Sequence, residues 1–206
     1  MSAVFAALSL TFGGSGQALA QQVGKLPVVQ AVVRTAAAVA TPTPTTAASA
    51  DVAVAREASM LQNAGWPLYA LVDKFSAGAP MTDEANCIAV AVYHEARGES
   101  LEGQLAVAKV IMNRAASGKY PTSWCGVVKQ PWQFSFVNPH SGQFPSVDQT
   151  SDAWRKALGV TRLAVANAVQ SVPSDVLWYH ANYVAPSWRN NLTRVEKIGT
   201  HIFYRA

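Results

Sequence analysis

Glu95 is the residue whose type and position most directly suggest chemistry. It lies in the stretch 93–99, which reads Tyr-His-Glu-Ala-Arg-Gly-Glu, near the end of an expected helix. At 100° per residue, Glu95 shares a helix face with Ile88 and Val92, so its carboxyl group continues an apolar stripe. Burial and the negative end of the helix dipole raise a carboxyl pKa, whereas the charge of Arg97 lowers it. Glu95 is therefore a candidate general acid; the alternative is a salt-bridged residue at a helix end.

Capping residues predict two consecutive helices around this stretch. Thr82 is a good N-cap for the first helix, which we expect to end near Gly98. Ser100 is a plausible N-cap for the second helix, over residues 101–117. The second helix is apolar around so much of its circumference that we expect it to be buried at the centre of the domain.

Two shorter elements are expected after these helices. Residues 123–128 predict a short helical turn. The segment 130–136 alternates aromatic and polar residues, a pattern typical of a strand or an extended loop with one apolar face. Gln133 and Ser135 would then lie together on its polar face.

The C-terminal part of the chain predicts a helix followed by a hairpin. Residues 151–170 form the expected helix, with Gly159 as a weak point. Residues 194–198 and 201–205 flank Gly199-Thr200, and a two-residue loop that begins with glycine indicates a β-hairpin. Helices followed by a small antiparallel sheet make an α+β domain.

The N-terminal region differs in composition from the rest. Residues 1–20 are uncharged and end in Ala18-Leu19-Ala20, which is typical of a signal peptide. The apolar core is too short to span a bilayer, and no stable span is expected in the mature chain. No Lys or Arg precedes that core, so a start further upstream and an ordinary terminus are alternatives. Residues 21–80 are interpreted as an Ala/Thr/Pro-rich linker with a possible helix within 51–75, and residues 81–206 as the domain that contains Glu95.

Charge and cysteine content limit the partners and the compartment. The 206 residues carry a formal net charge of +4, and no stretch concentrates five or six basic residues, so a nucleic-acid partner is not expected. Cys87 and Cys125 would be buried free thiols in a cytosolic protein. In an exported protein they would form a disulfide, worth about 4 kcal/mol in the chain-entropy model.

Two other reactions were considered before glycoside cleavage. A zinc-protease helix needs a second histidine four residues after His94, and that position holds Gly98. Neither a metal nor another cofactor is expected. A cysteine nucleophile with a histidine base is a further alternative, but neither cysteine lies in a recognisable nucleophile context.

Glycoside cleavage by Glu95 is the third possibility. Sugars are bound by aromatic faces and by amide and hydroxyl groups, and the segments 130–136 and 177–188 contain both. Of the aromatic residues, Phe134, Phe136, Trp154 and Trp178 are more typical of a core than of a sugar-binding surface. Glycosidases usually use two carboxyl groups, and no second one is obvious. A mechanism with one carboxyl group requires a nucleophile from the substrate itself.

Several short motifs occur in a fixed order between residues 84 and 206. They are Ala91–Glu99, Gly103–Ala108, Asn113-Arg114, Tyr120-Pro121, Cys125–Val128, Gln133–Ser135, Tyr179–Trp188 and Ile198–Tyr204. Together they resemble the SleB-type cell wall hydrolase family, which includes spore cortex-lytic enzymes; the last two are similar to its proteobacterial branch. The resemblance implies a lysozyme-like α+β domain that acts on the glycan strands of peptidoglycan.

By this resemblance Glu95 is the catalytic residue of a lytic transglycosylase. It would protonate the glycosidic oxygen between N-acetylmuramic acid and N-acetylglucosamine, then act as base while the muramoyl C6 hydroxyl closes a 1,6-anhydro ring. Simple hydrolysis is the alternative outcome. Glu99 would hold the neighbouring loop or act as a secondary acid, and Asn113 would support the site without touching substrate. For the cleft wall we expect Gln133, Ser135, Tyr179, His180, Tyr183 and Trp188.

Peptidoglycan is thus the expected partner, and the periplasm or cell envelope the expected location after export. The oligomeric state is left open. A non-catalytic peptidoglycan-binding or regulatory module is the alternative from a different functional class. Such a module would use the same aromatic residues without a protonated glutamate in the cleft.

Overall fold

The computed structural model of the protein describes residues 44–206. The expected signal peptide and the first part of the linker, up to residue 43, lie outside the described residues. In chain order the elements are α1 (Pro44–Asn63), α2 (Leu68–Lys74), α3 (Asp83–Ala96), α4 (Leu101–Ala116), α5 (Trp124–Val128), α6 (Asp152–Val165), β1 (Val176–Ala181), the 3₁₀ helix η1 (Ser187–Asn191), β2 (Thr193–Ile198) and β3 (His201–Arg205).

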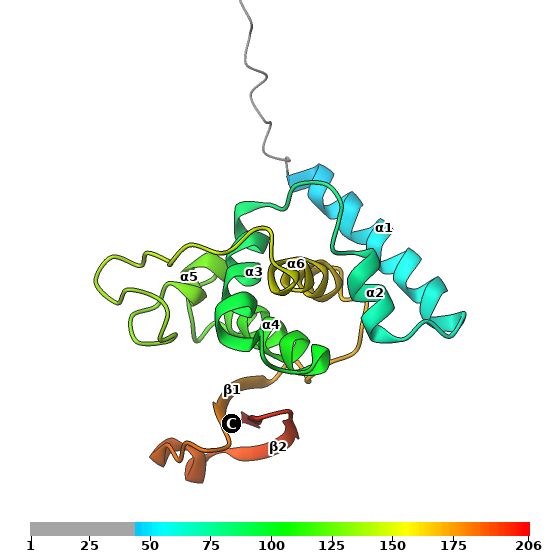
Figure 1. Cartoon of the computed structure of the whole chain (residues 1–206). Coiled ribbons are helices and arrows are strands. Elements are labelled where there is room, and N and C mark those ends of the chain that lie inside the picture. Colours follow the sequence, from blue (N-terminus) through cyan, green and yellow to red (C-terminus); the bar gives the residue numbers. More distant parts are fainter. Residues whose placement is uncertain (1–43) are drawn as a thin grey trace, which may run out of the picture. The chain divides into compact units, whose positions relative to one another are not determined.

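Three helices start at the serine or threonine that the sequence indicates. The side chains of Thr82, Ser100 and Ser151 each accept a hydrogen bond from a backbone N–H one turn later, at the N-termini of α3, α4 and α6. Helices α3 and α4 both pack against α6, which Figure 1 shows end-on between its neighbours. The main core lies between these helices, and its fully buried side chains include Ile88, Val92, Leu105, Ile111, Val127 and Leu163.

The packed part of the chain starts earlier than the boundary expected at residue 81. Helices α1 and α2 both pack against α6 (Figure 1). Ala58 of α1 and Leu71 and Val72 of α2 are almost fully buried and belong to the main core. The expected helix within 51–75 therefore exists as two helices, and both are part of the folded unit and not of a linker. The weak apolar periodicity of this region hid its packing from sequence analysis.

Gly159 was expected to weaken its helix, but in the structure it is needed for helix packing. It lies in α6 where α2 crosses, and a Cβ added there would overlap the carbonyl oxygen of Val72. The missing side chain thus permits the close approach of the two helices. Helix α6 also ends earlier than expected, at Val165, and is followed by Asn167 in the left-handed region with φ of 51°.

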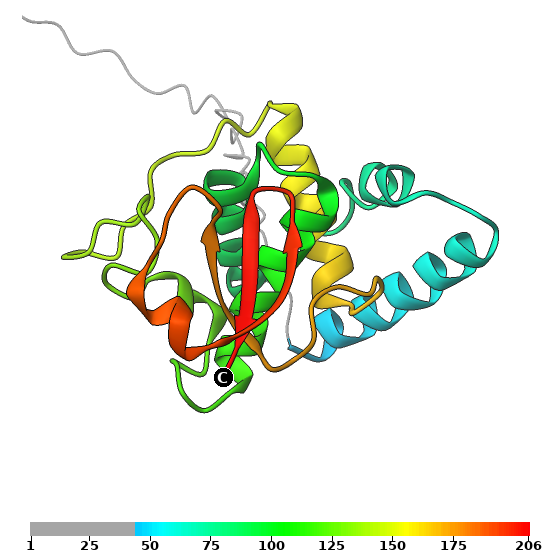
Figure 2. The ribbon, with the colours of Figure 1, turned by 90° about the horizontal axis from the view of Figure 1, so that it is seen from below.

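A three-stranded antiparallel sheet completes the fold, in the order β1-β3-β2. The β2–β3 hairpin forms around Gly199-Thr200 as expected, whereas β1 was not assigned as a strand from the sequence. Figure 2 shows the sheet in front of α4, with β3 in the middle. Ala106 and Val110 of α4 and Phe203 of β3 form a second, smaller core between helix and sheet. The predicted α+β class with a small antiparallel sheet is confirmed.

The segment 130–136 is not a strand. It consists of successive turns, in which Phe134 is buried and Trp132 is exposed. Trp132 has a positive φ of 64°, a conformation that side chains with a Cβ rarely adopt and that no strand contains. In this folded loop Phe134 is buried, Phe136 is half-buried and Trp132 is exposed, so the three aromatic side chains do not form one apolar face.

Two further features concern cysteines and membranes. Cys87 of α3 and Cys125 of α5 form a disulfide, with their Cα atoms 5.2 Å apart. Among residues 44–206, no helix combines the length and the apolar character needed to cross a bilayer.

Candidate active site

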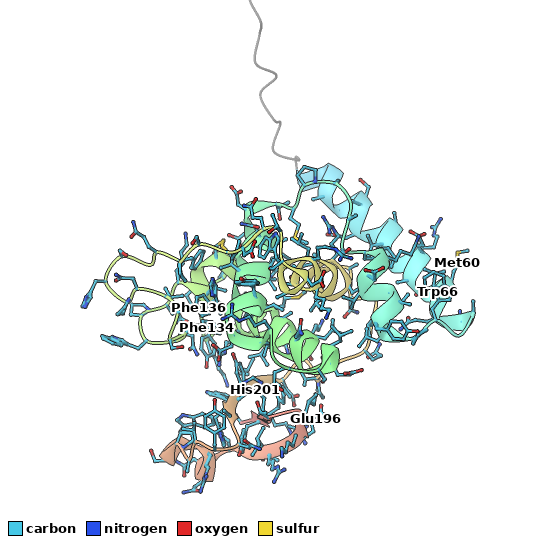
Figure 3. All side chains as sticks on the ribbon, viewed as in Figure 1. Met60, Trp66, Phe134, Phe136, Glu196 and His201 are labelled. Atoms are coloured by element: carbon cyan, nitrogen blue, oxygen red, sulfur yellow. A yellow bond between two sulfur atoms is a disulfide. The ribbon has the colours of Figure 1, made fainter. Side chains whose placement is uncertain are left out.

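A polar cleft of about 430 Å³ lies between the end of α3, the loop after α5 and the sheet. Figure 3 labels Phe134 and Phe136 in that loop and His201 in the sheet, on either side of this region. The cleft thus brings together segments that are about 100 residues apart in the chain. Its lining residues are His94, Glu95, Glu99, Arg114, Gln133, Ser135, Tyr179, His180, Ala181, Tyr183, Val184, Thr200 and His201.

Glu95 is half-buried in the last turn of α3 and lines this cleft. Burial raises its pKa above the ordinary value, because the charged carboxylate loses hydration. Two neighbouring residues, Tyr179 and Arg114, lower the pKa of Glu95, but by less than burial raises it. The Tyr179 hydroxyl donates a long hydrogen bond of 3.5 Å to Oε1, and the positive charge of Arg114 favours the carboxylate. A carboxyl group whose pKa is raised in this way is better suited to act as a general acid.

Tyr179 and Arg114 form the floor beneath Glu95. Burial and the nearby Glu95 raise the pKa of the Tyr179 phenol well above its ordinary value, so it remains a hydrogen-bond donor. Arg114 is only 3% exposed; its Nε donates to the carbonyl oxygen of Leu177 at 2.7 Å. Its guanidinium lies over the rings of Tyr120, at 5.2 Å, and Tyr179, at 5.9 Å. The Nη1 atom of Arg114 is buried and has no hydrogen-bond partner among the described residues.

Glu99 joins the α3–α4 loop to the turn of the hairpin. Its carboxylate accepts hydrogen bonds from the Thr200 backbone N–H, at 2.9 Å, and from the Thr200 hydroxyl. Burial raises the pKa of Glu99, but these hydrogen bonds and the nearby His201 outweigh it and hold the pKa below the ordinary value. Gly199, with φ of 56°, leaves room for this contact, because a Cβ there would collide with Glu99 Oε2. The contacts favour the loop-holding role for Glu99 over that of a secondary acid.

His180 and Trp188 do not point into the cleft as expected. Consecutive residues of a strand face opposite sides, so Tyr179 faces the helices and His180 the other side of the sheet. The His180 ring stacks on Tyr204 at 5.3 Å, and its Nε2 is 2.9 Å from the Tyr204 hydroxyl oxygen. Trp188, in η1, packs against the same two rings and does not line the cleft. His180 therefore lines only the edge of the cleft, and Trp188 is the one predicted wall residue that does not line it.

The structure does bring Gln133, Ser135 and Tyr183 to the cleft, as expected. Tyr183 is 83% exposed at its rim. Asn113 lies outside the cleft, where its side-chain amide donates to the carbonyl oxygens of Pro173, at 2.8 Å, and Val176, at 3.1 Å. These two bonds hold the start of β1 against α4, so Asn113 positions the strand that carries Tyr179.

Arg114, His201, Thr200 and His94 line the cleft but were missed by sequence analysis. His94 stacks on Phe136 at 5.0 Å, and its buried Nε2 has no hydrogen-bond partner among the described residues. Arg114 lies next to Asn113 in one of the quoted motifs, and this position could have indicated that Arg114 belongs to the site. The signal for His201 was its position directly after the hairpin loop.

Comparison with known families matches residues 98–204 to the cell wall hydrolase family, which is 107 of 206 residues. The chain belongs to the cell wall hydrolase family. This agrees with the resemblance seen in the sequence motifs. The matched residues begin three positions after Glu95, so the case for that residue rests on its place in the cleft.

Curated relatives include two spore cortex-lytic enzymes. That of Bacillus subtilis (strain 168) is 32% identical over 126 residues, which cover 61% of this chain and 39% of the relative. That of Oceanobacillus iheyensis is 35% identical over 124 residues, covering 59% and 41%. The chain thus spans about two fifths of these relatives. The solved catalytic domain of the germination-specific lytic transglycosylase SleB from Bacillus anthracis aligns at 28% identity and a TM-score of 0.48, covering 63% of this chain and 99% of that domain.

Proposed function

We propose that this protein cleaves the glycan strands of peptidoglycan with Glu95 as its general acid and base. Membership of the cell wall hydrolase family and the names of the relatives support the substrate class. The observation that carries the assignment is Glu95 itself: a carboxyl group with a raised pKa at the centre of a polar cleft. Glu99 is the other carboxyl group among the lining residues, and its pKa is lowered, which does not suit a general acid.

The reaction proceeds by one proton cycle on Glu95. The protonated carboxyl group donates to the glycosidic oxygen between N-acetylmuramic acid and N-acetylglucosamine, and the bond from C1 to that oxygen breaks. The muramoyl C6 hydroxyl then attacks C1 and returns its proton to Glu95, which leaves a 1,6-anhydro end. If water attacks in place of the C6 hydroxyl, the product is a reducing end. In both routes one carboxyl group serves as acid and then as base.

Other residues of the cleft assist this cycle. Tyr179 orients the Glu95 carboxyl group through its hydroxyl. Gln133 and Ser135 offer hydrogen-bonding groups to the hydroxyls and acetamido groups of the sugars. Tyr183, exposed at the rim, offers an aromatic face to a sugar ring.

Turnover of purified peptidoglycan by Glu95→Gln tests the assignment. General acid and base catalysis contributes about 10²–10⁴-fold, so the variant is expected to lose at least a hundredfold in rate. Glu99→Gln is the matched control and should retain more activity than Glu95→Gln. A Glu95→Gln variant with the wild-type rate refutes the assignment, and mass spectrometry of the released fragments distinguishes anhydro from reducing ends. Binding to sacculi by the wild type without released fragments would favour the non-catalytic module instead.

We also propose that the chain is exported and that the bond between Cys87 and Cys125 forms after export. An oxidising compartment supports such a bond, and the family acts on a target outside the cytoplasm. Mass spectrometry of protein isolated from the cell envelope and alkylated without reduction should find neither thiol labelled. Full labelling of both would exclude the bond.

A further inference from the structure

A second hollow, of about 620 Å³, lies between α2, the start of α4 and the start of α6. It shares no lining residue with the cleft that contains Glu95. Two aromatic side chains line it, Trp66 and Tyr69, together with charged residues from α2 and α6. Figure 3 shows Trp66 at the turn between α1 and α2, on the opposite side of the helices from Phe134. The hollow is therefore a distinct feature of the surface.

The two aromatic side chains are exposed, and they lie in and just after the turn that joins α1 to α2. Trp66 is 43% and Tyr69 70% exposed. Gly65, with φ of 84°, ends α1, and the Trp66 backbone N–H donates to the carbonyl oxygen of Leu61 at 3.0 Å. Pro67 follows directly as the N-cap of α2, which restricts the backbone of Trp66 to extended conformations. Large aromatic side chains held together at a concave surface indicate a binding site.

The charges around the hollow leave one cation without a partner. Arg155 bridges Asp73 of α2, at 2.6 Å, and Asp152 of α6, at 2.9 Å. Lys74 pairs with Glu57 at 2.8 Å. Lys156 also lines the hollow and is exposed, and within residues 44–206 it forms no ion pair. The hollow therefore offers two aromatic faces and one free positive charge.

The α3–α4 loop connects a residue of the hollow to a residue of the cleft. Leu101 lines the hollow and Glu99 lines the cleft, and two residues of chain span at most about 7 Å. A long ligand held in the cleft can therefore reach the hollow by crossing the α3–α4 loop. A small ligand bound in the cleft is too short to occupy the hollow at the same time.

We infer that the hollow at Trp66 and Tyr69 binds a second stretch of the peptidoglycan on which the cleft acts. Sugar rings stack on the two aromatic faces, and Lys156 pairs with a carboxylate of the peptides attached to muramic acid. The inference rests on the proposed function for its substrate, but it assigns no role in the reaction to these residues. It makes the hollow a holding site that keeps an insoluble polymer on the enzyme.

Binding measurements in a Glu95→Gln background test this inference without turnover. Removing both aromatic faces, in Trp66→Ala with Tyr69→Ala, is expected to weaken binding to purified peptidoglycan by about tenfold. Met60→Ala is the matched control: Met60 is 66% exposed near Trp66 and does not line the hollow, so binding should not change (Figure 3). Lys156→Gln is expected to weaken binding at low salt only, since salt screens an exposed charge. Thermal melts verify that each variant is folded.

The results that would contradict this inference differ from the result that would contradict the proposed function. Wild-type affinity in the double aromatic variant overturns it, and so does an absence of binding by Glu95→Gln alone. A dimer of the wild type that dissociates in the aromatic variant, with unchanged binding to peptidoglycan, would assign the hollow to a second copy of the chain and also overturn it. The proposed function fails by a different result, namely full turnover by Glu95→Gln.

Discussion

Glu95 and Glu99 are four residues apart, yet their surroundings move their pKa values in opposite directions. Glu95 loses hydration in the cleft and gains one long hydrogen bond, so its pKa rises. Glu99 receives two hydrogen bonds from Thr200 in the hairpin turn, so its pKa falls. The raised pKa favours the protonated form of Glu95, while the lowered pKa favours the ionised form of Glu99, which holds the loop. Such a divergence supports the proposal that Glu95, and not Glu99, is the acid.

Replacing Tyr179 with phenylalanine tests this balance by pH. The Tyr179 hydrogen bond favours the charged form of Glu95, so its loss should raise the Glu95 pKa further. An acid loses its proton as pH rises through its pKa, so the alkaline limb of kcat/KM should move to higher pH. The profile is measured on soluble glycan fragments, with Tyr183→Phe as control because Tyr183 lines the cleft without contacting Glu95. An unmoved or lower alkaline limb would show that Tyr179 does not tune the acid.

At the scale of the elements, the contact between α2 and α6 determines how the first two helices join the domain. Gly159 permits that contact, since any side chain there meets the backbone of Val72. The same helix pair also forms the walls of the hollow at Trp66. A change at this crossing should therefore affect stability and the hollow together, and leave the cleft less affected.

Gly159→Ala is expected to destabilise the protein by about 1–3 kcal/mol. Alanine favours a helix over glycine by about 1 kcal/mol, but the overlap with a backbone carbonyl forces the two helices apart and outweighs that gain. Thermal or urea unfolding measures the difference. Gly98→Ala is the control, because a Cβ there meets no atom within 4 Å. A Gly159→Ala protein as stable as the wild type would mean that α2 is not tightly packed on α6.

At the scale of the whole molecule, the folded unit is larger than the 81–206 domain expected from the sequence, because α1 and α2 pack on α6. Burying an aliphatic side chain contributes about 1.5–3 kcal/mol, and α2 contributes two nearly inaccessible ones, Leu71 and Val72. Such contributions are large against the 5–15 kcal/mol that a domain typically retains. The helices that precede residue 81 are therefore part of what holds α6 in place.

A chain that starts at residue 81 is expected to melt well below the full chain, because the α6 surface under α2 becomes exposed. In the full chain, Leu71→Ala should cost about 2–5 kcal/mol of unfolding free energy. Tyr69→Ala is the matched control in the same helix, since Tyr69 is 70% exposed and should change stability little. Equal melting temperatures for residues 81–206 and the full chain would show that the domain begins at residue 81, as expected from the sequence.

Local features of the site could be read from the sequence, because their causes lie within a few residues. The caps at Thr82 and Ser100 fix the ends of two helices, and these place Glu95 on a buried face next to a loop. The hairpin at Gly199-Thr200 follows in the same way from one glycine between two strand-forming runs. Gln133 lines the cleft, although its segment is a series of turns and not a strand.

Only the tertiary structure decided which distant residues meet Glu95 and which side of the sheet faces them. Tyr179 and His180 are adjacent in β1, and the packing of Phe203 on α4 selects Tyr179 for the cleft and turns the His180 ring away. Arg114 reaches the site because Asn113 and Leu177 hold β1 against the end of α4, more than 60 residues away in the chain. Such choices depend on how two elements bury their apolar faces against each other, and no local pattern contains that information.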